Sequence, residues 1–427
     1  MAPAEQVLGP WLKGMASHGP WPTTQTIGAQ NWNLLNGDLT LPCAVLKSSA
    51  LAANSSAMRR FLELTGAELW PHGKTTMSPE LMARQLEDGA AGMTAATVQQ
   101  MEAMLLHGQR RILIANQVVG PAELRLLSGA LNRYPELELM VLVDSVESVQ
   151  LLQRGLSFVP DRRLGVLVEM GQVGARTGVR SVAEGLRVAA AVMDSAKLRL
   201  RGVETYEGIV PGADQLEIEK AITMLFGQTV ELAEAMSVRG YFREEPIILS
   251  GGGSCYYDMA ALSLHRAKTG DATRILVRSG CYLTHDDGWL AGFHERMRHR
   301  SPELTQGEPV PRPALEVWAH LQSRPEPTRG YATLGKRDAS YDIDLPKPLR
   351  WFRRDLHSEP QALPENHTVI ALNDQHAHLE FPASSPLQVG DLLCFGISHP
   401  CTTFDKWRAI PIVDDRYNVV SVVTTWF

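Results

Sequence analysis

The amino-acid sequence predicts a TIM-type α/β barrel of eight parallel strands followed by a C-terminal antiparallel β domain. Between about residues 42 and 285, short apolar runs alternate with amphipathic stretches, as parallel strands and crossover helices do. Beyond about residue 286 the helical periodicity fades, and short alternating segments stand between prolines, which is typical of antiparallel strands. A chain of 427 residues also exceeds the usual size of one domain, so two are expected.

Nine candidate strands precede residue 286. They are 42–47, 67–70, 90–95, 112–116, 139–144, 164–170, 198–205, 247–250 and 275–282. Helical periodicity lies between them, as at 57–64, 79–86, 98–106, 122–131 and 216–235. A barrel of eight strand–helix units takes about 250 residues, so one of the nine strands must lie outside it. The pattern alone leaves open which one.

The last part of the chain contains four candidate strands. These are 367–372, 377–381, 392–397 and 419–425. The proline-rich stretch 308–329 predicts a long surface excursion rather than an interdomain hinge.

Composition excludes several classes of protein. The formal net charge is −6, and no basic tract offers a footprint for phosphate backbones, so no nucleic-acid partner is expected. No apolar run approaches the roughly 20 residues of a membrane span, and the first residues do not form a secretion signal, so no membrane partner is expected. Five widely spaced cysteines fit reduced thiols better than a disulfide framework. These features favour a cytoplasmic location.

Lys74 is the first candidate for chemistry, because it lies four residues beyond the apolar run 67–70. The carboxyl ends of barrel strands are where barrel active sites are built. A partly desolvated lysine amine there can form a Schiff base with an aldehyde cofactor. Taken alone, a lysine in such a loop is more often a solvated surface group.

Four segments around Lys74 carry a resemblance to a known family. They are 71–75 (PHGKT), 78–81 (SPEL), 89–97 (GAAGMTAAT) and 112–120 (ILIANQVVG). Together they resemble the N-terminal half of D-serine dehydratases and D-threonine aldolases, which are similar to alanine racemase. The resemblance implies a pyridoxal 5'-phosphate barrel over residues 48–285 and a β domain over 286–427, to which 1–47 contributes a strand. It offers no counterpart for about 286–365.

The resemblance also implies the residues that hold the cofactor. Lys74 is the Schiff-base lysine, and Arg176, whose guanidinium stays protonated, contacts the cofactor ring. Tyr206 lies beside the cofactor, although packing in the core is the plain alternative for an aromatic residue. The phosphate is assigned to backbone N–H groups after the strand 247–250 and to a second contact near the end of the barrel. The residues assigned to the phosphate are Gly251, Gly252, Gly253, Gly280 and Tyr282.

A metal site is implied by His399 and Cys401, which resemble the His-x-Cys motif of the dehydratases. If the strand 392–397 continued through them, residues two apart would share one face and one ion. Nitrogen and sulfur ligands favour zinc, with manganese and magnesium as alternatives. His376, in a segment that resembles the one preceding the family's metal motif, is a candidate for orienting substrate, against a structural role. The chain departs from the family at Thr76 and Met77, where a His and a Lys are common, and this leaves the substrate open.

The predicted activity is that of a pyridoxal-phosphate- and metal-dependent lyase acting on D-configured β-hydroxy amino acids. β-Elimination would give a 2-oxo acid and ammonia. The nearest alternative is retro-aldol cleavage to glycine and an aldehyde, but the aldolases tend to carry His-x-Asp, so Cys401 favours elimination. The alternatives of another class are a non-catalytic pyridoxal-phosphate-binding protein and a metal-dependent barrel without that cofactor. A homodimer is also expected, with the apolar segments 7–12 and 21–35 covering its interface.

Overall fold

Eight parallel strands form a curled sheet in the computed structural model of the chain, which describes residues 5–15, 19–156, 164–242, 246–269, 272–307 and 309–427. The strands are β2 (Glu68–Leu69), β3 (Met93–Ala95), β4 (Arg111–Ile114), β5 (Glu138–Val143), β6 (Leu164–Met170), β7 (Leu198–Thr205), β8 (Ile247–Gly251) and β9 (Thr273–Val277). Their order is β2-β9-β8-β7-β6-β5-β4-β3. A parallel bridge between His72 and Thr94, continuing β2 and β3, closes the sheet into the predicted barrel.

Eight helices alternate with these strands. They are α1 (Ser48–Thr65), α2 (Pro79–Glu87), α3 (Val98–Leu106), α4 (Pro121–Arg133), α5 (Val146–Gly155), α6 (Val182–Met193), α7 (Gln215–Val238) and α8 (Tyr257–Leu264). Several begin where a hydroxyl or carboxylate accepts a backbone N–H of the first turn, as Ser78, Thr97 and Asp214 do. Such caps satisfy backbone N–H groups that a helix leaves without partners in its first turn, so these residues specify where the helices begin.

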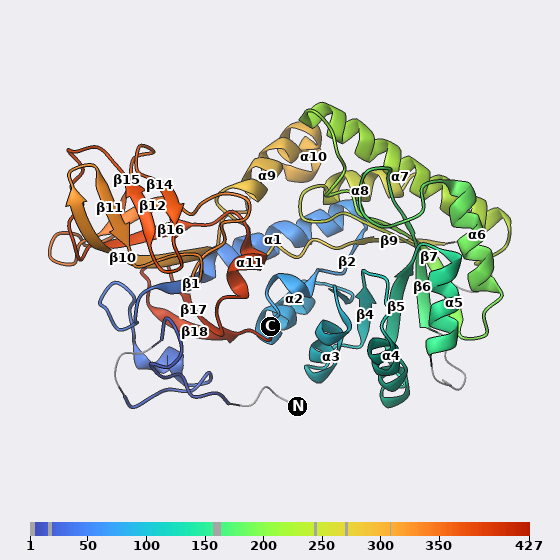
Figure 1. The fold of residues 1–427 in the computed structure, drawn as a ribbon, viewed down its shortest axis with the longest axis horizontal. Coiled ribbons are helices and arrows are strands. Elements are labelled where there is room, and N and C mark those ends of the chain that lie inside the picture. Colours follow the sequence, from blue (N-terminus) through green and yellow to red (C-terminus); the bar gives the residue numbers. More distant parts are fainter. Residues whose placement is uncertain (1–4, 16–18, 157–163, 243–245, 270–271, 308) are drawn as a thin grey trace.

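A second sheet of mixed direction forms the other lobe of the molecule (Figure 1). Its strands are β1 (Cys43–Lys47), β10 (Leu315–Glu326), β11 (Arg329–Ala332), β12 (Lys347–Phe352), β13 (Gln361–Ala362), β14 (Thr368–Leu372), β15 (Ala377–Glu380), β16 (Leu392–Gly396), β17 (Ala409–Val413) and β18 (Val419–Thr424). β1 lies between β10, with which it pairs antiparallel, and β17, with which it pairs parallel. The barrel and the separate β sheet confirm the predicted fold class.

Two predictions for residues 286–329 are wrong. The helices α9 (Trp289–Arg300) and α10 (Pro302–Thr305) lie where the helical rhythm was expected to have ended. α9 buries Leu290, Phe293 and Met297 on one side, but charged residues between them obscure the pattern. The expected surface excursion contains β10, whose first five residues are buried in the sheet. The prolines of this stretch stand mainly at its two ends, so they flank the strand instead of preventing it.

The N-terminal segments pack onto the chain's own β lobe. Leu8, Ile27 and Leu34 are buried in a core that includes Trp318 of β10. The short 3-10 helix Ile27–Gln30 contacts β18. These apolar residues therefore cover the β sheet of their own chain, and the homodimer with its interface stays a prediction. Within the described residues, no helix combines the length and the apolar character that crossing a bilayer requires.

Candidate active site

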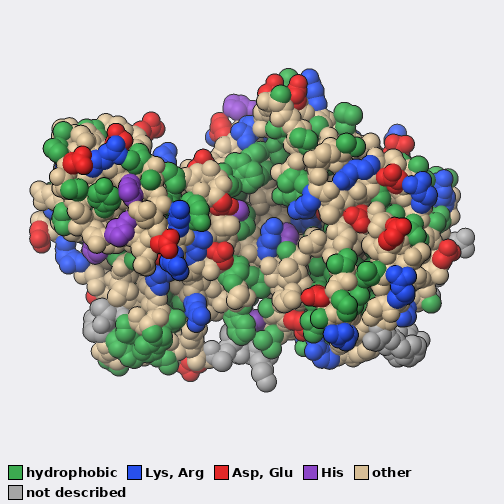
Figure 2. All heavy atoms as spheres, viewed as in Figure 1, with side chains coloured by type: hydrophobic (Ala, Val, Ile, Leu, Met, Phe, Trp, Pro, Cys, Tyr) green, Lys and Arg blue, Asp and Glu red, His purple; other side chains and the backbone are tan. Residues whose placement is uncertain are grey.

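A cavity of about 230 Å³ lies at the carboxyl ends of the barrel strands, where the barrel meets the β lobe. Figure 2 shows this face of the molecule hollowed between the two lobes. The predicted site residues that line the cavity are Lys74, Arg176, Tyr206, Gly253, Gly280, His399 and Cys401. Segments far apart in the sequence therefore converge on one volume.

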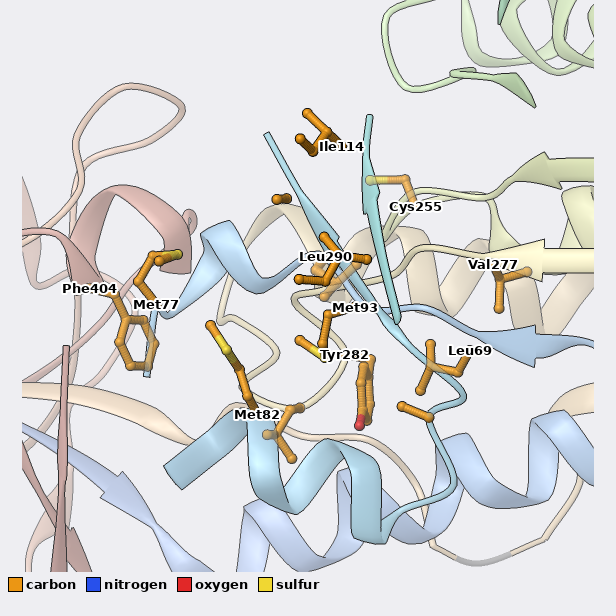
Figure 3. Packing of buried hydrophobic residues seen from close by; sticks show 14 of the residues in the cluster. Leu69, Met77, Met82, Met93, Ile114, Cys255, Val277, Tyr282, Leu290 and Phe404 are labelled. Carbon is orange, nitrogen blue, oxygen red and sulfur yellow. The ribbon is translucent and has the colours of Figure 1, made fainter. Parts of the chain in front are cut away.

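Lys74 is presented by a single 3-10 turn, Gly73–Thr75, directly after β2. The preceding Gly73 is tightly packed, because a Cβ there would lie 2.4 Å from Met104 and 3.0 Å from Met82. Figure 3 shows the methionine-rich core around this turn, with Met77, Met82 and Met93 among the packed side chains. The apolar Met77 is buried, and its backbone N–H donates to the carbonyl oxygen of Gly73 at 2.8 Å, so it helps to fix the turn that carries Lys74.

Arg176 and Tyr206 come from the loops after β6 and β7. The guanidinium carbon of Arg176 lies 5.0 Å from the centre of the Tyr206 ring, a cation–π distance. Burial raises the pKa of the Tyr206 hydroxyl above its ordinary value, so it stays protonated at neutral pH. The pair forms one wall of the cavity.

Arg278, at the end of β9, forms a buried ion pair with Glu204 at 2.6 Å. Its guanidinium also donates to Ser250 Oγ at 2.7 Å and to the carbonyl oxygen of Thr205 at 3.1 Å. Burial raises the pKa of Glu204 above its ordinary value, and the neighbouring guanidinium of Arg278 opposes that rise. Both residues line the cavity, and neither was among the sequence candidates.

The glycine run after β8 differs from its prediction. The N–H groups of Gly252 and Gly253 donate to the carboxylate of Glu207, at 3.0 and 2.7 Å. Gly251 and Gly252 are buried outside the cavity lining, and only Gly253 of the three lines it. The glycines do turn N–H groups toward an anion, but that anion is a side chain of the protein.

Of the two residues predicted for the second phosphate contact, one lines the cavity and the other does not. Gly280 lines the cavity and needs to be glycine, since a Cβ there would lie 2.4 Å from the carbonyl oxygen of His72 and 2.6 Å from Thr75 Oγ1. The buried Tyr282 is outside the lining, and its hydroxyl faces Asp88 at 3.5 Å. Ser254 and Cys255 line the cavity beside Gly253, so the cup available to a phosphate is formed by residues 253–255 and 280–281.

His399 and Cys401 reach the cavity by a different geometry from the predicted one. β16 ends at Gly396, and Cys401 lies in the short helix α11 (Pro400–Phe404), for which His399 is the N-cap residue. Strand alternation therefore does not relate them. His399 Nδ1 lies 2.5 Å from Asp342 Oδ2, and Cys401 Sγ lies 3.6 Å from Cys281 Sγ. The described part of the chain contains no group of three or more His, Cys, Asp or Glu arranged to hold a metal.

The structure does not bring His376 to the cavity. It lies in the exposed turn between β14 and β15 and is not part of the lining. The sequence placed it by its position before the His-x-Cys motif, but β14 pairs with β15, and β15 pairs with β11, in a part of the β sheet away from β16. Proximity along the chain was a poor guide here because the sheet carries this hairpin away from α11.

Two buried polar atoms at the cavity test whether pyridoxal phosphate fits. Among the described residues, His72 Nδ1 and Glu204 Oε2 have no hydrogen-bond partner. Buried polar atoms are rarely left so, and a polar ligand would satisfy them. With an amine at Lys74, a guanidinium at Arg176 and a cup of backbone N–H groups, the lining matches a ring that carries an aldehyde and a phosphate.

Comparison with known proteins gives two adjoining family matches. Residues 46–267 match the alanine racemase N-terminal domain, and residues 314–413 match the putative serine dehydratase domain. A D-threonine aldolase of Arthrobacter sp is 26% identical over 376 residues, covering 88% of this chain and 89% of the relative. A D-threo-3-hydroxyaspartate dehydratase of Delftia sp. (strain HT23) is 28% identical over 212 residues, covering 47% of this chain and 53% of the relative.

Solved structures share the fold. The crystal structure of D-threonine aldolase from Filomicrobium marinum has a TM-score of 0.72 at 22% identity, over 91% of this chain and 95% of that one. The barrel, the cavity and these relatives define the chain as a pyridoxal-phosphate-dependent lyase. It belongs to the alanine racemase N-terminal domain family, and a serine dehydratase domain follows that domain in the chain.

Proposed function

We propose that this lyase acts on D-configured β-hydroxy amino acids and removes the β-hydroxyl by elimination, giving a 2-oxo acid and ammonia. The observation that carries the proposal is the convergence of Lys74, His399 and Cys401 on one cavity. Cys401 Sγ lies 3.5 Å from the hydroxyl of Thr75, the neighbour of Lys74. A proton acceptor for Cα and ligands for a hydroxyl-binding metal thus face the same substrate.

The proposed roles in holding pyridoxal phosphate follow from the lining. Lys74 would carry the cofactor, Arg176 and Tyr206 would flank its ring, and the cup formed by residues 253–255 and 280–281 would contact its phosphate. When bound, the cofactor supplies an electron sink for the bonds at Cα. The Nζ atom of Lys74 would take the Cα proton as general base.

The metal would be held by His399 Nε2 and Cys401 Sγ. The bond between Nδ1 and Asp342 supports this role, because ligating histidines commonly donate their other ring N–H to a carboxylate. A mixed nitrogen and sulfur set favours zinc. When bound, the metal supplies a Lewis acid that makes the β-hydroxyl a better leaving group. A variant of the similar dehydratase with alanine in place of a cysteine is described as metal-free.

Retro-aldol cleavage is the second candidate, because the D-threonine aldolase of Arthrobacter sp matches 88% of this chain. That reaction needs a base on the β-hydroxyl and leaves the Cα–H bond intact. Cys401, where the aldolases tend to carry aspartate, favours elimination.

One incubation separates the two reactions. The protein, supplied with pyridoxal phosphate and zinc, is given D-serine, D-threonine or D-3-hydroxyaspartate, and products are identified by mass spectrometry. Elimination predicts 2-oxo acids and equimolar ammonia, whereas cleavage predicts glycine and an aldehyde from the two substituted substrates. Glycine without oxo acid would overturn the proposal in favour of the aldolase. The Lys74→Ala variant serves as the inactive control.

A further inference from the structure

The start of α9 forms the wall of the cavity next to His399. The backbone N–H of Asp287 donates to the carbonyl oxygen of Ile397 at 2.9 Å, and a Cβ on Gly288 would lie 2.8 Å from Ser398 Cβ. The cavity residues contributed by this wall are Asp286, Trp289 and Leu290. The β-substituent of a substrate whose hydroxyl met His399 would therefore lie against α9.

This wall is apolar apart from one fixed carboxylate. Asp286 is 2% exposed, and its oxygens accept the N–H groups of Gly288 at 2.9 Å and of Leu290 at 2.9 and 3.1 Å. Those bonds cap α9 and hold the carboxylate in place. Trp289 and Leu290 give the rest of the surface, and the Trp289 ring is steadied by an edge contact with Phe293 at 5.2 Å.

The positive groups of the cavity come from other elements than α9 and have other partners. Among the described residues, the cations and imidazoles of the lining are Lys74, Arg176, Arg278, His72 and His399. Lys74 and Arg176 are assigned to the cofactor, His399 to the metal, and Arg278 is paired with Glu204 at 2.6 Å. Burial lowers the pKa of His72 well below its ordinary value, so it is neutral. The α9 wall itself offers no positive group to a β-carboxylate, since its lining residues are Asp286, Trp289 and Leu290.

We infer that the cavity selects β-hydroxy amino acids whose β-substituent is uncharged and apolar, such as a methyl or phenyl group, and excludes those with a β-carboxylate. This inference rests on the proposed function and names its substrate class. Trp289 and Leu290 bury the apolar group, while Asp286 repels a carboxylate that would also lose its water without gaining a cation. Discrimination of at least about tenfold is expected.

The test measures the preference for a ligand side chain separately from the reaction. D-2-Aminobutyrate, D-phenylalanine and D-aspartate lack the hydroxyl, so their binding is measured in the protein loaded with pyridoxal phosphate and zinc, by the change in cofactor absorption. The dissociation constant of D-aspartate should exceed the other two at least about tenfold. Equal or tighter binding of D-aspartate overturns the inference. If the binding order holds but D-threonine, D-β-phenylserine and D-3-hydroxyaspartate all give no product, the proposed function fails and the inference stands.

Two variants locate the preference on α9. Trp289→Arg supplies a cation and should strengthen D-aspartate binding about tenfold or more while weakening that of D-phenylalanine. Trp11→Arg is the matched control, because Trp11 is 63% exposed and outside the cavity lining. Asp286→Asn keeps the shape of the side chain and an oxygen that accepts the N–H groups of α9. It therefore tests the inference if Trp289→Arg prevents folding. It should strengthen D-aspartate binding several-fold. Unchanged D-aspartate binding in the folded variants would remove α9 from substrate selection.

Discussion

The imidazole of His399 and the carboxylate of Asp342 are held together, with Nδ1 2.5 Å from Oδ2, although 57 residues separate them in the chain. Asp342 lies between β11 and β12, and its other oxygen accepts the hydroxyl of Thr402 in α11 at 2.8 Å. The two contacts fix the carboxylate and leave Nε2 of His399 as the nitrogen that can bind a metal.

Asp342→Asn should weaken zinc binding about 10- to 100-fold, because the substituted amide no longer holds the imidazole in the same orientation and basicity. Zinc affinity is measured by competition with a chromophoric chelator. Asp374→Asn is the control, since Asp374 takes part only in an exposed ion pair with Arg337. Equal zinc affinity of the Asp342 variant and the unaltered protein would show that His399 is not a ligand positioned by this carboxylate.

Removal of the metal should abolish elimination and leave the visible absorption of the bound cofactor intact, because different residues are proposed to hold the two groups. Dialysis against a chelator and Cys401→Ala should have the same effect. Cys401→Asp supplies a harder oxygen ligand and should shift the metal preference from zinc toward manganese or magnesium. Full turnover by protein shown to be metal-free by elemental analysis would exclude a metal-assisted reaction.

Lys74→Ala should remove the absorption that borohydride bleaches irreversibly in the unaltered protein and reduce turnover to background, because no other lysine lines the cavity within the described part of the chain. Absorption spectra before and after reduction provide the measurement, and Lys406→Ala, outside the lining, provides the control. A Lys74 variant that kept both the bleachable absorption and full activity would contradict the assignment.

Arg278→Met should destabilise the cofactor-free protein by about 3–5 kcal/mol, because it leaves the buried Glu204 without its partner. The double variant with Glu204→Gln should recover much of that loss, since it removes the unpaired charge as well. Urea unfolding of both variants measures the two free energies. Equal destabilisation by the single and double changes would mean that packing of the arginine, and not its charge, stabilises this part of the barrel.

Asp287→Asn should become more stabilising as pH rises. Burial raises the pKa of Asp287 to about 7, and its Oδ2 atom has no hydrogen-bond partner among the described residues. A carboxyl pKa that is higher in the folded state contributes stability at low pH and loses it as pH rises through the folded pKa. From pH 5 to pH 8 the variant should gain about 1–3 kcal/mol relative to the unaltered protein in urea unfolding. Asp355→Asn, an exposed control, should show no such change.

Local patterns in the sequence were sufficient for the elements of the barrel and for several residues of the site. Apolar runs predicted β6 and β7 with the bounds that the structure gives, because such runs depend on a few neighbouring residues. Lys74 was recognisable because barrel architecture places the end of every strand at one face. α9 and β10 were missed, since charged residues and prolines masked their periodicity.

The sequence by itself determined the fold class, the barrel strands and the set of reactive side chains at the strand ends. Only the tertiary structure decided which groups meet. In the structure the glycine N–H groups donate to Glu207, and the hydroxyl of Tyr282 faces Asp88. His376 lies in an exposed turn, and Asp342 contacts His399. The reason is that strand and helix periodicity depends on near neighbours in the chain. These contacts instead join residues far apart in the chain or depend on loop geometry, and both are set by the packing of the two lobes.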